Sequence, residues 1–210
     1  MGQIAIAILA AGRGSRFGGD RPKPLALLGG RSLVSMALSA AVDSSLAPVL
    51  LVVGYGDDQV AAVAPPSVRV VRNPGWQQGI ASSLQAALRA LEPEGSIEAL
   101  CVGLAGQPLV GADSYPRLAA AYREGASIAV ATYEGARRNP VLLACSIWQD
   151  AMKLEGDEGA RQLMKIHPVV EVDCDRTGNP LDVDTQDDIQ LLETNILPTT
   201  RLVDKKEIFS

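Results

Sequence analysis

Short apolar segments alternate with amphipathic stretches along the first half of the chain. Four of the apolar segments have the length of a β-strand: residues 4–10, 49–53, 68–71 and 99–104. Two of the stretches between them, residues 32–42 and 80–91, have apolar residues at helical spacing, as Ile80, Leu84 and Leu88 show. Because strands that alternate with helices form parallel sheets covered by helices, this pattern predicts an α/β fold.

The alternation becomes less regular after residue 105. We expect a helix after Asp113, strands at residues 127–132 and 140–144, and two short helices around Trp148 and Arg161. This order fits a sheet that is mixed at its far edge.

The segment LDVDTQDDIQLLE, residues 181–193, combines a strand signal with a helix start. It predicts a short strand that ends at Asp184, followed by a helix that Thr185 caps. Asp187 and Asp188 would then lie in the first helical turn, where the helix dipole favours negative charge.

Length and composition favour one compact unit. With 210 residues, of which 47% are hydrophobic and 20% charged, the chain can bury one core without disulfides or a structural metal. From about residue 195 onward the periodicity is lost and the chain ends in mixed charges. We therefore predict one domain over residues 1–194 and a poorly ordered or loosely docked tail over residues 195–210.

Charge and cysteine content exclude several classes of protein. The formal net charge is -5 and the basic residues are spread along the chain, which argues against nucleic acid as a partner. The opening MGQIAIAILAAG has no basic leader, and no apolar stretch is long enough to cross a bilayer, so we expect a cytoplasmic protein without a membrane partner. Cys101, Cys145 and Cys174 lack metal-type spacing and suit a reducing compartment.

The connection after the first strand, AGRGSRFGGDRPKPLALLGGR, is long for a compact domain and rich in glycine and cationic residues. Glycines let backbone N–H groups approach a ligand closely, and the loop follows the carboxyl end of a strand, where α/β sheets bind ligands. Phosphate is therefore the expected ligand. The spacing matches neither GxxxxGK[ST] nor GxGxxG, and a surface loop with solvated cations remains the alternative.

Within that connection, LAAGRGSRFGGDRPKPL resembles the LAAGxGxRxGxxKxL loop of nucleotidyltransferases. Four further stretches, NPGWQQGIASSLQAAL, LAGQPLV, LEGDEGARQLM and LDVDTQDDI, are similar in order to blocks of the MobA-like nucleotidyltransferases, particularly the molybdenum cofactor cytidylyltransferases. The resemblance covers about residues 4–192. It implies a Rossmann-like three-layer fold of the nucleotide-diphospho-sugar-transferase type, with a mostly parallel mixed sheet.

The resemblance also implies a reaction: transfer of CMP from CTP to molybdopterin with release of pyrophosphate, or guanylyl transfer from GTP. Its implied cofactor is Mg²⁺, and a molybdoenzyme or its chaperone would be a transient partner. The residues implied to bind the nucleotide are Leu9, Ala10, Ala11, Gly12, Arg13, Gly14, Arg16, Lys23, Gly79, Ser82 and Ser83. Among them, Arg16 and Lys23 would be catalytic by stabilising the leaving group and the α-phosphate. Trp76 lies beside this block, and we expect it to pack rather than to stack on the base.

One position departs from the family pattern. Where the family usually has an aspartate that holds magnesium, this chain has Gly106, which offers no side-chain oxygen. Asp182 and Asp184 match the second acidic block and are the expected metal ligands; their alternation around Val183 would place them on one face of a strand. Three interpretations follow: a magnesium site completed by triphosphate and water, a variant of low activity, or a protein that binds nucleotide without turnover.

The acceptor site is implied by two further blocks. Arg137 and Asn139 resemble a loop near the acceptor, although Arg138 stands where the family usually has glycine. Arg161 is a third candidate. The alternatives are an ordinary exposed turn for the arginine pair and a helical i,i+4 ion pair between Asp157 and Arg161.

Overall fold

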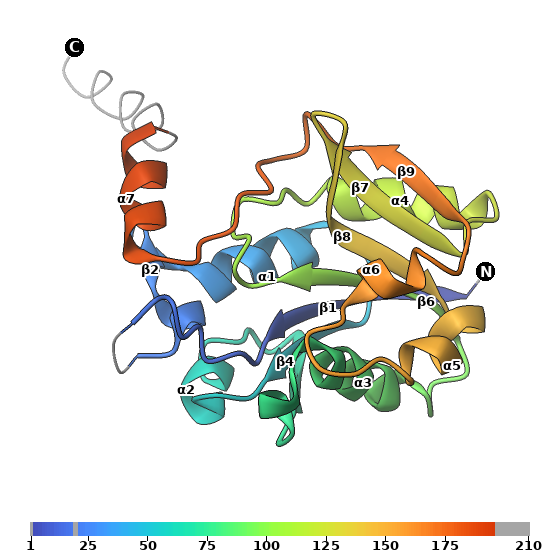
Figure 1. The fold of residues 1–210 in the computed structure, drawn as a ribbon, viewed down its shortest axis with the longest axis horizontal. Helices are drawn as coiled ribbons and strands as arrows, with labels where there is room; N and C mark the ends of the chain where they lie inside the picture. Colours follow the sequence, from blue (N-terminus) through green and yellow to red (C-terminus); the bar gives the residue numbers. More distant parts are fainter. Residues whose placement is uncertain (1, 19–20, 196–210) are drawn as a thin grey trace, which may run out of the picture.

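In the computed structural model, which describes residues 2–18 and 21–195, a seven-stranded sheet lies between two layers of helices (Figure 1). The spatial order of the strands is β5-β4-β1-β6-β8-β7-β9. Their bounds are β1 Gln3–Ala10, β4 Val49–Val53, β5 Val68–Arg72, β6 Ile97–Leu104, β7 Ile128–Tyr133, β8 Ala136–Ala144 and β9 Val169–Asp173. The expected three-layer, mostly parallel α/β fold is therefore confirmed. The predicted tail lies, beyond Asn195, outside the described residues.

Strand direction changes at one side of the sheet. β1 pairs in parallel with both β4 and β6, and β4 pairs in parallel with β5. β8 runs antiparallel to its neighbours β6 and β7, whereas β9 is parallel to β7. The prediction of a mixed far edge is thus confirmed, although β8 begins four residues before the predicted Pro140. From β1 the chain first adds β4 and β5 on one side and then crosses to β6 on the other, so β1 marks the topological switch point.

Seven α-helices accompany the described strands. They are α1 Leu33–Asp43, α2 Asp57–Ala61, α3 Ile80–Leu91, α4 Ser114–Arg123, α5 Trp148–Ala151, α6 Ala160–Leu163 and α7 Gln186–Asn195. α1 and α4 pack on one face of the sheet, and α3 and α5 on the other (Figure 1). None of the described helices is both long and apolar enough to cross a bilayer.

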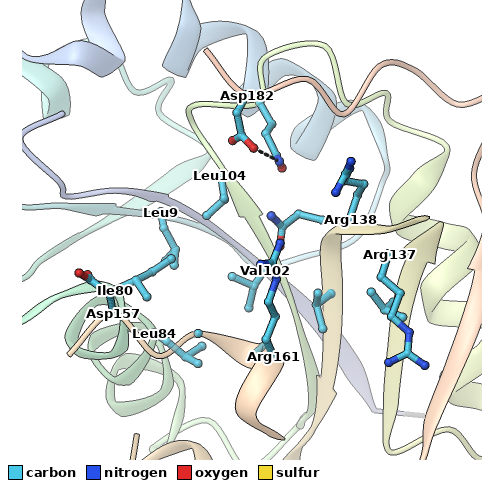
Figure 2. Close-up of a pocket in the computed structure, with 16 residues that line it drawn as sticks. Leu9, Ile80, Leu84, Val102, Leu104, Arg137, Arg138, Asp157, Arg161 and Asp182 are labelled. Carbon is cyan, nitrogen blue, oxygen red and sulfur yellow. Dashed lines mark hydrogen bonds between the residues drawn. The ribbon is translucent and has the colours of Figure 1, made fainter. Parts of the chain in front are cut away.

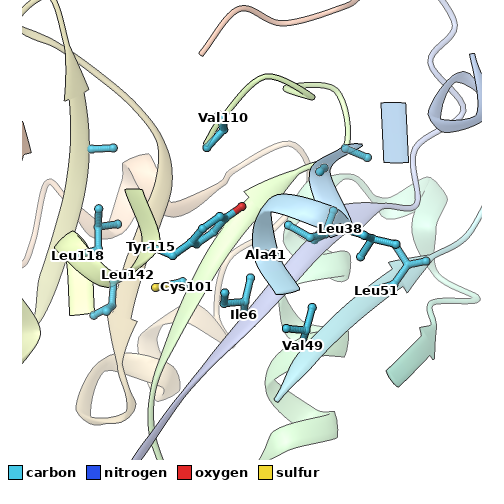
Figure 3. Packing of buried hydrophobic residues seen from close by; sticks show 14 of the residues in the cluster. Ile6, Leu38, Ala41, Val49, Leu51, Cys101, Val110, Tyr115, Leu118 and Leu142 are labelled. Carbon is cyan, nitrogen blue, oxygen red and sulfur yellow. The ribbon is translucent and has the colours of Figure 1, made fainter. Parts of the chain in front are cut away.

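The central strand β1 shows how the sequence builds both layers. Its side chains alternate between the faces, so Ile6 and Ile8 join the core under α1 and α4, while Ala5 and Ala7 join the core under α3. All four are fully buried, which explains why this strand reads as an unbroken apolar run. Figure 3 shows the first core, where Ile6 lies near Cys101, Leu38 and Tyr115. Burying one such aliphatic side chain contributes about 1.5–3 kcal/mol.

A smaller third cluster joins distant parts of the chain at the carboxyl end of β1. Phe17 of the glycine-rich loop packs with Val183 and with Ile189 and Leu192 of α7. The cluster also contains Leu33 of α1 and Leu28, which belongs to the short hairpin of β2 (Leu27–Leu28) and β3 (Arg31–Ser32). The glycine-rich loop is therefore fastened to the C-terminal helix.

The segment before α7 corrects one prediction. Residues 181–184 do not form a strand within the described sheet; the Val183 N–H donates to the Gly106 carbonyl at 2.7 Å. The cap prediction is confirmed, because the Asp188 N–H donates to Thr185 Oγ1 at 3.2 Å. In return the Thr185 N–H donates to Asp188 Oδ2 at 2.7 Å, which makes a reciprocal capping box.

Candidate active site

Two neighbouring cavities open at the carboxyl ends of β1 and β6. The first, here called the loop cavity, has a volume of about 380 Å³ and is lined by residues 9–15, Lys23, Trp76 and Gly79 among others. The second, here called the arginine cavity, has a volume of about 270 Å³ and is lined by the predicted acceptor residues Arg137, Asn139 and Arg161 and by Arg138. Both cavities share Leu9, Ile80, Leu104, Asp157 and Asp182. They therefore form one continuous cleft of the size that small-molecule sites have.

The glycine-rich loop and Lys23 form one wall of the loop cavity. Gly14 has φ +67°, and a Cβ at this position would lie 2.7 Å from the Lys23 side chain. Only glycine both adopts this conformation freely and leaves room for the lysine stem. The ammonium of Lys23, a side chain with 15% of its surface exposed, donates to Asp184 Oδ1 at 2.8 Å. The structure thus places the predicted Lys23 inside the cleft and beside a predicted metal ligand.

Asp184 is paired with both predicted catalytic cations. Besides Lys23, Arg16 lies within an ion-pair distance, with Nη2 3.0 Å from Asp184 Oδ2. The Arg16 side chain is 77% exposed, whereas Asp184 is 35% exposed, so this second pair is well solvated. Lys23 and Asp184 are 161 positions apart in the sequence, so only the fold brings them into contact.

Asp182 occupies the boundary between the two cavities. Burial, with a smaller contribution from the neighbouring Asp184 carboxylate, raises the pKa of Asp182. Gln107 opposes this shift, because its Nε2 donates to Asp182 Oδ2 at 3.1 Å. Gln107 is a site residue that the sequence analysis missed, although the block LAGQPLV contained it beside Gly106.

Gly106 lies against the same charged groups. A Cβ at this position would be 3.2 Å from Lys23 Nζ and 3.9 Å from Asp182 Oδ1. A side chain here would therefore project into the group formed by Lys23, Asp182 and Asp184. The end of a lysine is flexible, so a small shift would accommodate it.

The opposite wall of the loop cavity is the start of α3. Gly79, with φ +91°, packs so closely on Gly156 that a Cβ would collide with the Gly156 carbonyl oxygen. Ser83 lines the loop cavity as predicted, but Ser82 does not. The Ser82 hydroxyl donates to the Gly79 carbonyl at 2.8 Å and accepts from Asn73 Nδ2 at 2.9 Å, which gives it a structural role at the helix start.

Aromatic side chains flank the loop cavity. Trp76 lines it while also packing edge-on against Tyr55, with ring centroids 5.6 Å apart. The guanidinium of Arg13 lies 5.4 Å from the centre of the Tyr55 ring, a cation–π distance. The expectation that Trp76 packs is confirmed, and the structure adds that it forms part of the cleft wall.

The arginine cavity combines cations with an apolar floor. Figure 2 shows Arg161 extending toward the middle of the cavity, Arg138 to one side of it and Arg137 directed away, where Arg137 Nε lies 2.7 Å from Glu171 Oε1. The floor consists of aliphatic side chains, namely Ile80, Leu84, Val102, Val130 and Val141. Asn139 also lines the cavity. The structure therefore brings the predicted acceptor residues together, with Arg137 already engaged by a carboxylate.

The structure corrects two alternatives for this region. Arg137 and Arg138 are exposed, as that alternative had it, but they lie on the strand β8, which begins at Ala136, and not in a turn. Asp157 and Arg161 form no helical i,i+4 pair, because α6 begins only at Ala160 and Asp157 lies in the preceding turn. Asp157 instead lines both cavities, a position that the sequence did not indicate.

Comparison with known proteins identifies the family. The sequence model of the MobA-like NTP transferase domain matches residues 6–172. The chain belongs to the MobA-like NTP transferase family. The crystal structure of the Mycobacterium tuberculosis Rv0371c homologue from Mycobacterium sp. strain JC1 has a TM-score of 0.81 and 29% identity, covering 92% of this chain and 96% of that one.

Other relatives show how far the likeness extends. Molybdopterin-guanine dinucleotide biosynthesis protein A from Archaeoglobus fulgidus has a TM-score of 0.70 over 90% of this chain and 97% of its own, but at 15% identity it shows the shared fold alone. The bifunctional protein GlmU of Cellvibrio japonicus is 38% identical over 95 residues, which are 45% of this chain and 21% of that protein. The chain spans less than a third of the length of the curated relatives it matches.

A divalent cation is consistent with this family and with these residues. The structure of Rv0371c from Mycobacterium tuberculosis H37Rv in complex with manganese is 27% identical, with a TM-score of 0.77, and covers 92% of this chain and 100% of that one. Within residues 2–18 and 21–195, no group of three or more His, Cys, Asp or Glu side chains could hold a metal. One or two carboxylates commonly hold a divalent cation together with substrate phosphates and water, and Asp182 and Asp184 offer two, although both Asp184 oxygens pair with Arg16 and Lys23 here. A cation would also relieve the repulsion between these two neighbouring carboxylates.

Proposed function

We propose that this MobA-like protein transfers CMP from CTP to molybdopterin and releases pyrophosphate. The observation that carries the proposal is the continuous cleft, in which the glycine-rich loop with Lys23 lies at one end and the arginine cavity at the other. Asp182 lies on the boundary that the two substrates would share. A transferase that joins two phosphorylated molecules needs this arrangement of two anion sites around one reacting centre.

The chain's own residues have distinct tasks in this reaction. The loop backbone and Lys23 bind the triphosphate, and Lys23 and Arg16 stabilise the charge that develops on the α-phosphate and on pyrophosphate as the acceptor phosphate attacks in line. Gly79 and Ser83 lie near the base and ribose. Asp182 and Asp184 would hold Mg²⁺, which when bound neutralises phosphate charge and orients the triphosphate.

The acceptor phosphate would bind in the arginine cavity. Arg161 and Asn139 line that cavity, and the aliphatic floor suits the body of a partly apolar acceptor. Arg137 is held by Glu171, so Arg161 and the neighbouring Arg138 are better placed to contact a phosphate. A molybdoenzyme or its chaperone would receive the product.

Pyrophosphate release tests the proposal directly. The purified chain is incubated with magnesium, purified molybdenum cofactor and CTP, GTP, ATP or UTP in turn. Release with CTP alone supports cytidylyl transfer, and release with GTP alone assigns the guanylyl reaction. If no nucleotide gives pyrophosphate release, although the chain melts cooperatively and is therefore folded, transfer to this acceptor is refuted.

Gly106 favours a second candidate function, a nucleotide-binding protein with impaired catalysis. Its test is the same assay on Gly106→Asp, with Gly95→Asp as the matched control. Gly95 lies on an exposed loop, where an added Cβ would meet no other part of the described chain. This candidate is supported if the parent releases no pyrophosphate and Gly106→Asp, but not Gly95→Asp, does. Pyrophosphate release by the parent refutes it.

A further inference from the structure

Both carboxylate oxygens of Asp184 are paired with cations. Oδ1 accepts from the ammonium of Lys23 at 2.8 Å, and Oδ2 lies 3.0 Å from Arg16 Nη2. Each oxygen of this proposed metal ligand therefore already contacts a positive charge. A divalent cation that approached Asp184 in this arrangement would meet two like charges, which repel it.

The same two cations are those that the proposed function assigns to the triphosphate. Lys23 lines the loop cavity, and its side chain is only 15% exposed, so its charge depends on Asp184 for compensation. Arg16 is 77% exposed, so solvent screens its pair with Asp184. Phosphate oxygens and the Asp184 carboxylate thus compete for one pair of cations.

The backbone of Asp184 is fixed independently of this competition. Its N–H donates to Asp188 Oδ2 at 2.8 Å, and the N–H of the preceding Val183 donates to the Gly106 carbonyl at 2.7 Å. Val183 itself is fully buried in the cluster that joins the glycine-rich loop to α7. The carboxylate therefore stays at the cleft when its cationic partners change.

We propose that Asp184 makes a triphosphate and a divalent cation bind to this cleft as a unit. Without triphosphate, Lys23 and Arg16 close Asp184 to the metal. Phosphate oxygens that take over these two cations free the carboxylate, which then binds the metal together with Asp182. The inference rests on the proposed function, because it assigns the loop to the triphosphate and the two aspartates to the metal. Since coupling between two ligands is reciprocal, a metal on Asp184 equally releases the two cations to the phosphates.

The first test measures the affinity of the purified chain for Mn²⁺ alone, by electron paramagnetic resonance. Lys23→Met removes one cation from Asp184. Its matched control is Lys153→Met, since Lys153 pairs with Asp150 at 2.8 Å and lines neither cavity of the cleft. We expect Lys23→Met to bind Mn²⁺ about tenfold more tightly than the parent, and Lys153→Met to stay within about twofold of it. Arg16→Gln should give a smaller gain, because its pair is solvated.

A second substitution shows whether the gain depends on Asp184. Adding Asp184→Asn to Lys23→Met should return the Mn²⁺ affinity to the parent value or below it, because the released ligand is lost again. If the gain survives in that double variant, it reflects one positive charge fewer near the cleft, and the inference is overturned. An Mn²⁺ affinity of Lys23→Met equal to that of the parent overturns it as well.

Inorganic triphosphate tests the coupling from the other side, because it carries the phosphates common to all nucleoside triphosphates. Its affinity is measured by titration calorimetry with EDTA in place of metal. Asp184→Asn should strengthen this binding about fivefold, because Lys23 and Arg16 lose a competing anion. The control is Asp187→Asn, an exposed carboxylate of α7, which should change the affinity by less than about twofold. Weaker binding by Asp184→Asn would show that the carboxylate positions the two cations for phosphate, and would refute the inference.

Neither probe needs CTP, the acceptor or turnover, so the two proposals fail separately. A parent that releases no pyrophosphate refutes the transferase, while the Mn²⁺ and triphosphate affinities still decide the coupling. An active parent without these changes in affinity keeps the transferase and loses the coupling. A parent that does not bind inorganic triphosphate overturns the coupling together with the triphosphate role of the loop. Thermal melts show which chains are folded, and Arg16→Gln, at an exposed position, carries the Mn²⁺ test if Lys23→Met is not folded.

Discussion

Neutralising Asp182 tests whether the cleft stores an unfavourable charge. Burial raises the pKa of Asp182, so the folded state holds the proton more tightly than the unfolded chain does. Between the ordinary aspartate pKa and the raised folded pKa, the folded protein binds more protons, and its free energy of unfolding falls as pH rises. At pH values above the raised folded pKa, Asp182 is ionised in both states, and the loss in free energy of unfolding has reached its full size. Asp182→Asn removes it, so the variant should be more stable than the parent at neutral pH.

The size of this gain follows from the surroundings of Asp182. Asp182 is an exposed residue beside Asp184, and Gln107, Lys23 and Arg138 partly compensate its charge. Substitutions that relieve such an unfavourable group commonly raise the free energy of unfolding by about 0.5–2 kcal/mol. Because solvent screens the Asp182 charge, we expect a gain of about 0.5–1 kcal/mol. For a chain of this length that raises Tm by roughly 1–4 °C. The Asn Oδ1 still accepts from Gln107, so packing is retained.

The assay is a set of melts of parent and variant from pH 3 to 8, together with pyrophosphate release. The stability difference should be small at pH 3 and reach its plateau at neutral pH, while turnover falls by at least 10–100-fold through loss of a metal ligand. Asp188→Asn is the control, for which we expect a change in stability of the opposite sign. Hydrogen bonds from the Asp184 N–H and from Thr185 lower the pKa of Asp188, so its substitution should destabilise the protein at neutral pH. An Asp182→Asn variant less stable than the parent at pH 7 refutes the reasoning.

Three further changes probe the same cleft. Lys23→Ala should lower kcat about 10²–10³-fold with little loss of stability because Asp184 keeps Arg16; equal kcat values for Lys23→Ala and the exposed control Lys153→Ala in a turnover assay would contradict this. Gly106→Asp should lower the magnesium concentration for half-maximal turnover, and the same shift in Gly95→Asp would remove that interpretation. Phe17→Ala should destabilise the protein by about 3 kcal/mol in denaturant titrations and raise the KM for CTP, since Phe17 fastens the loop to α7; a normal KM would show that the loop holds its shape alone.

The parts of the fold that were predictable are those in which local pattern and burial agree. β4 and α3 begin and end at the predicted residues, because β4 is apolar on both faces and α3 has a clear apolar stripe. β9 was missed because VVEVD at residues 169–173 is an exposed edge strand with few buried positions. Residues 181–184 alternate like a strand, yet the Val183 N–H donates to the Gly106 carbonyl in a turn, and the Leu181 and Asp184 N–H groups donate to side chains.

The site was predictable as a set of residues but not as a set of contacts. The motifs indicated Lys23 and Asp184 separately, and only the fold pairs them. Ser82 was predicted to lie near the nucleotide because it belongs to a family block. In the structure its hydroxyl instead hydrogen-bonds to Asn73 and to the Gly79 carbonyl. Gln107 escaped notice because a buried amide has no sequence signature. Its place in the site follows from the hydrogen bond that its Nε2 donates to Asp182, 75 positions away in the sequence.

The meaning of Gly106 depends on the charges around it. With glycine, the carboxylates of Asp182 and Asp184 face two cations, Lys23 and Arg16, so the four charges balance. An aspartate at position 106 would add a third carboxylate within reach of Lys23 and Asp182. It would offer another ligand to a metal but would also add repulsion in its absence. Glycine therefore removes a repulsive charge as well as a ligand, and any metal affinity gained by Gly106→Asp should be accompanied by a loss of stability without metal.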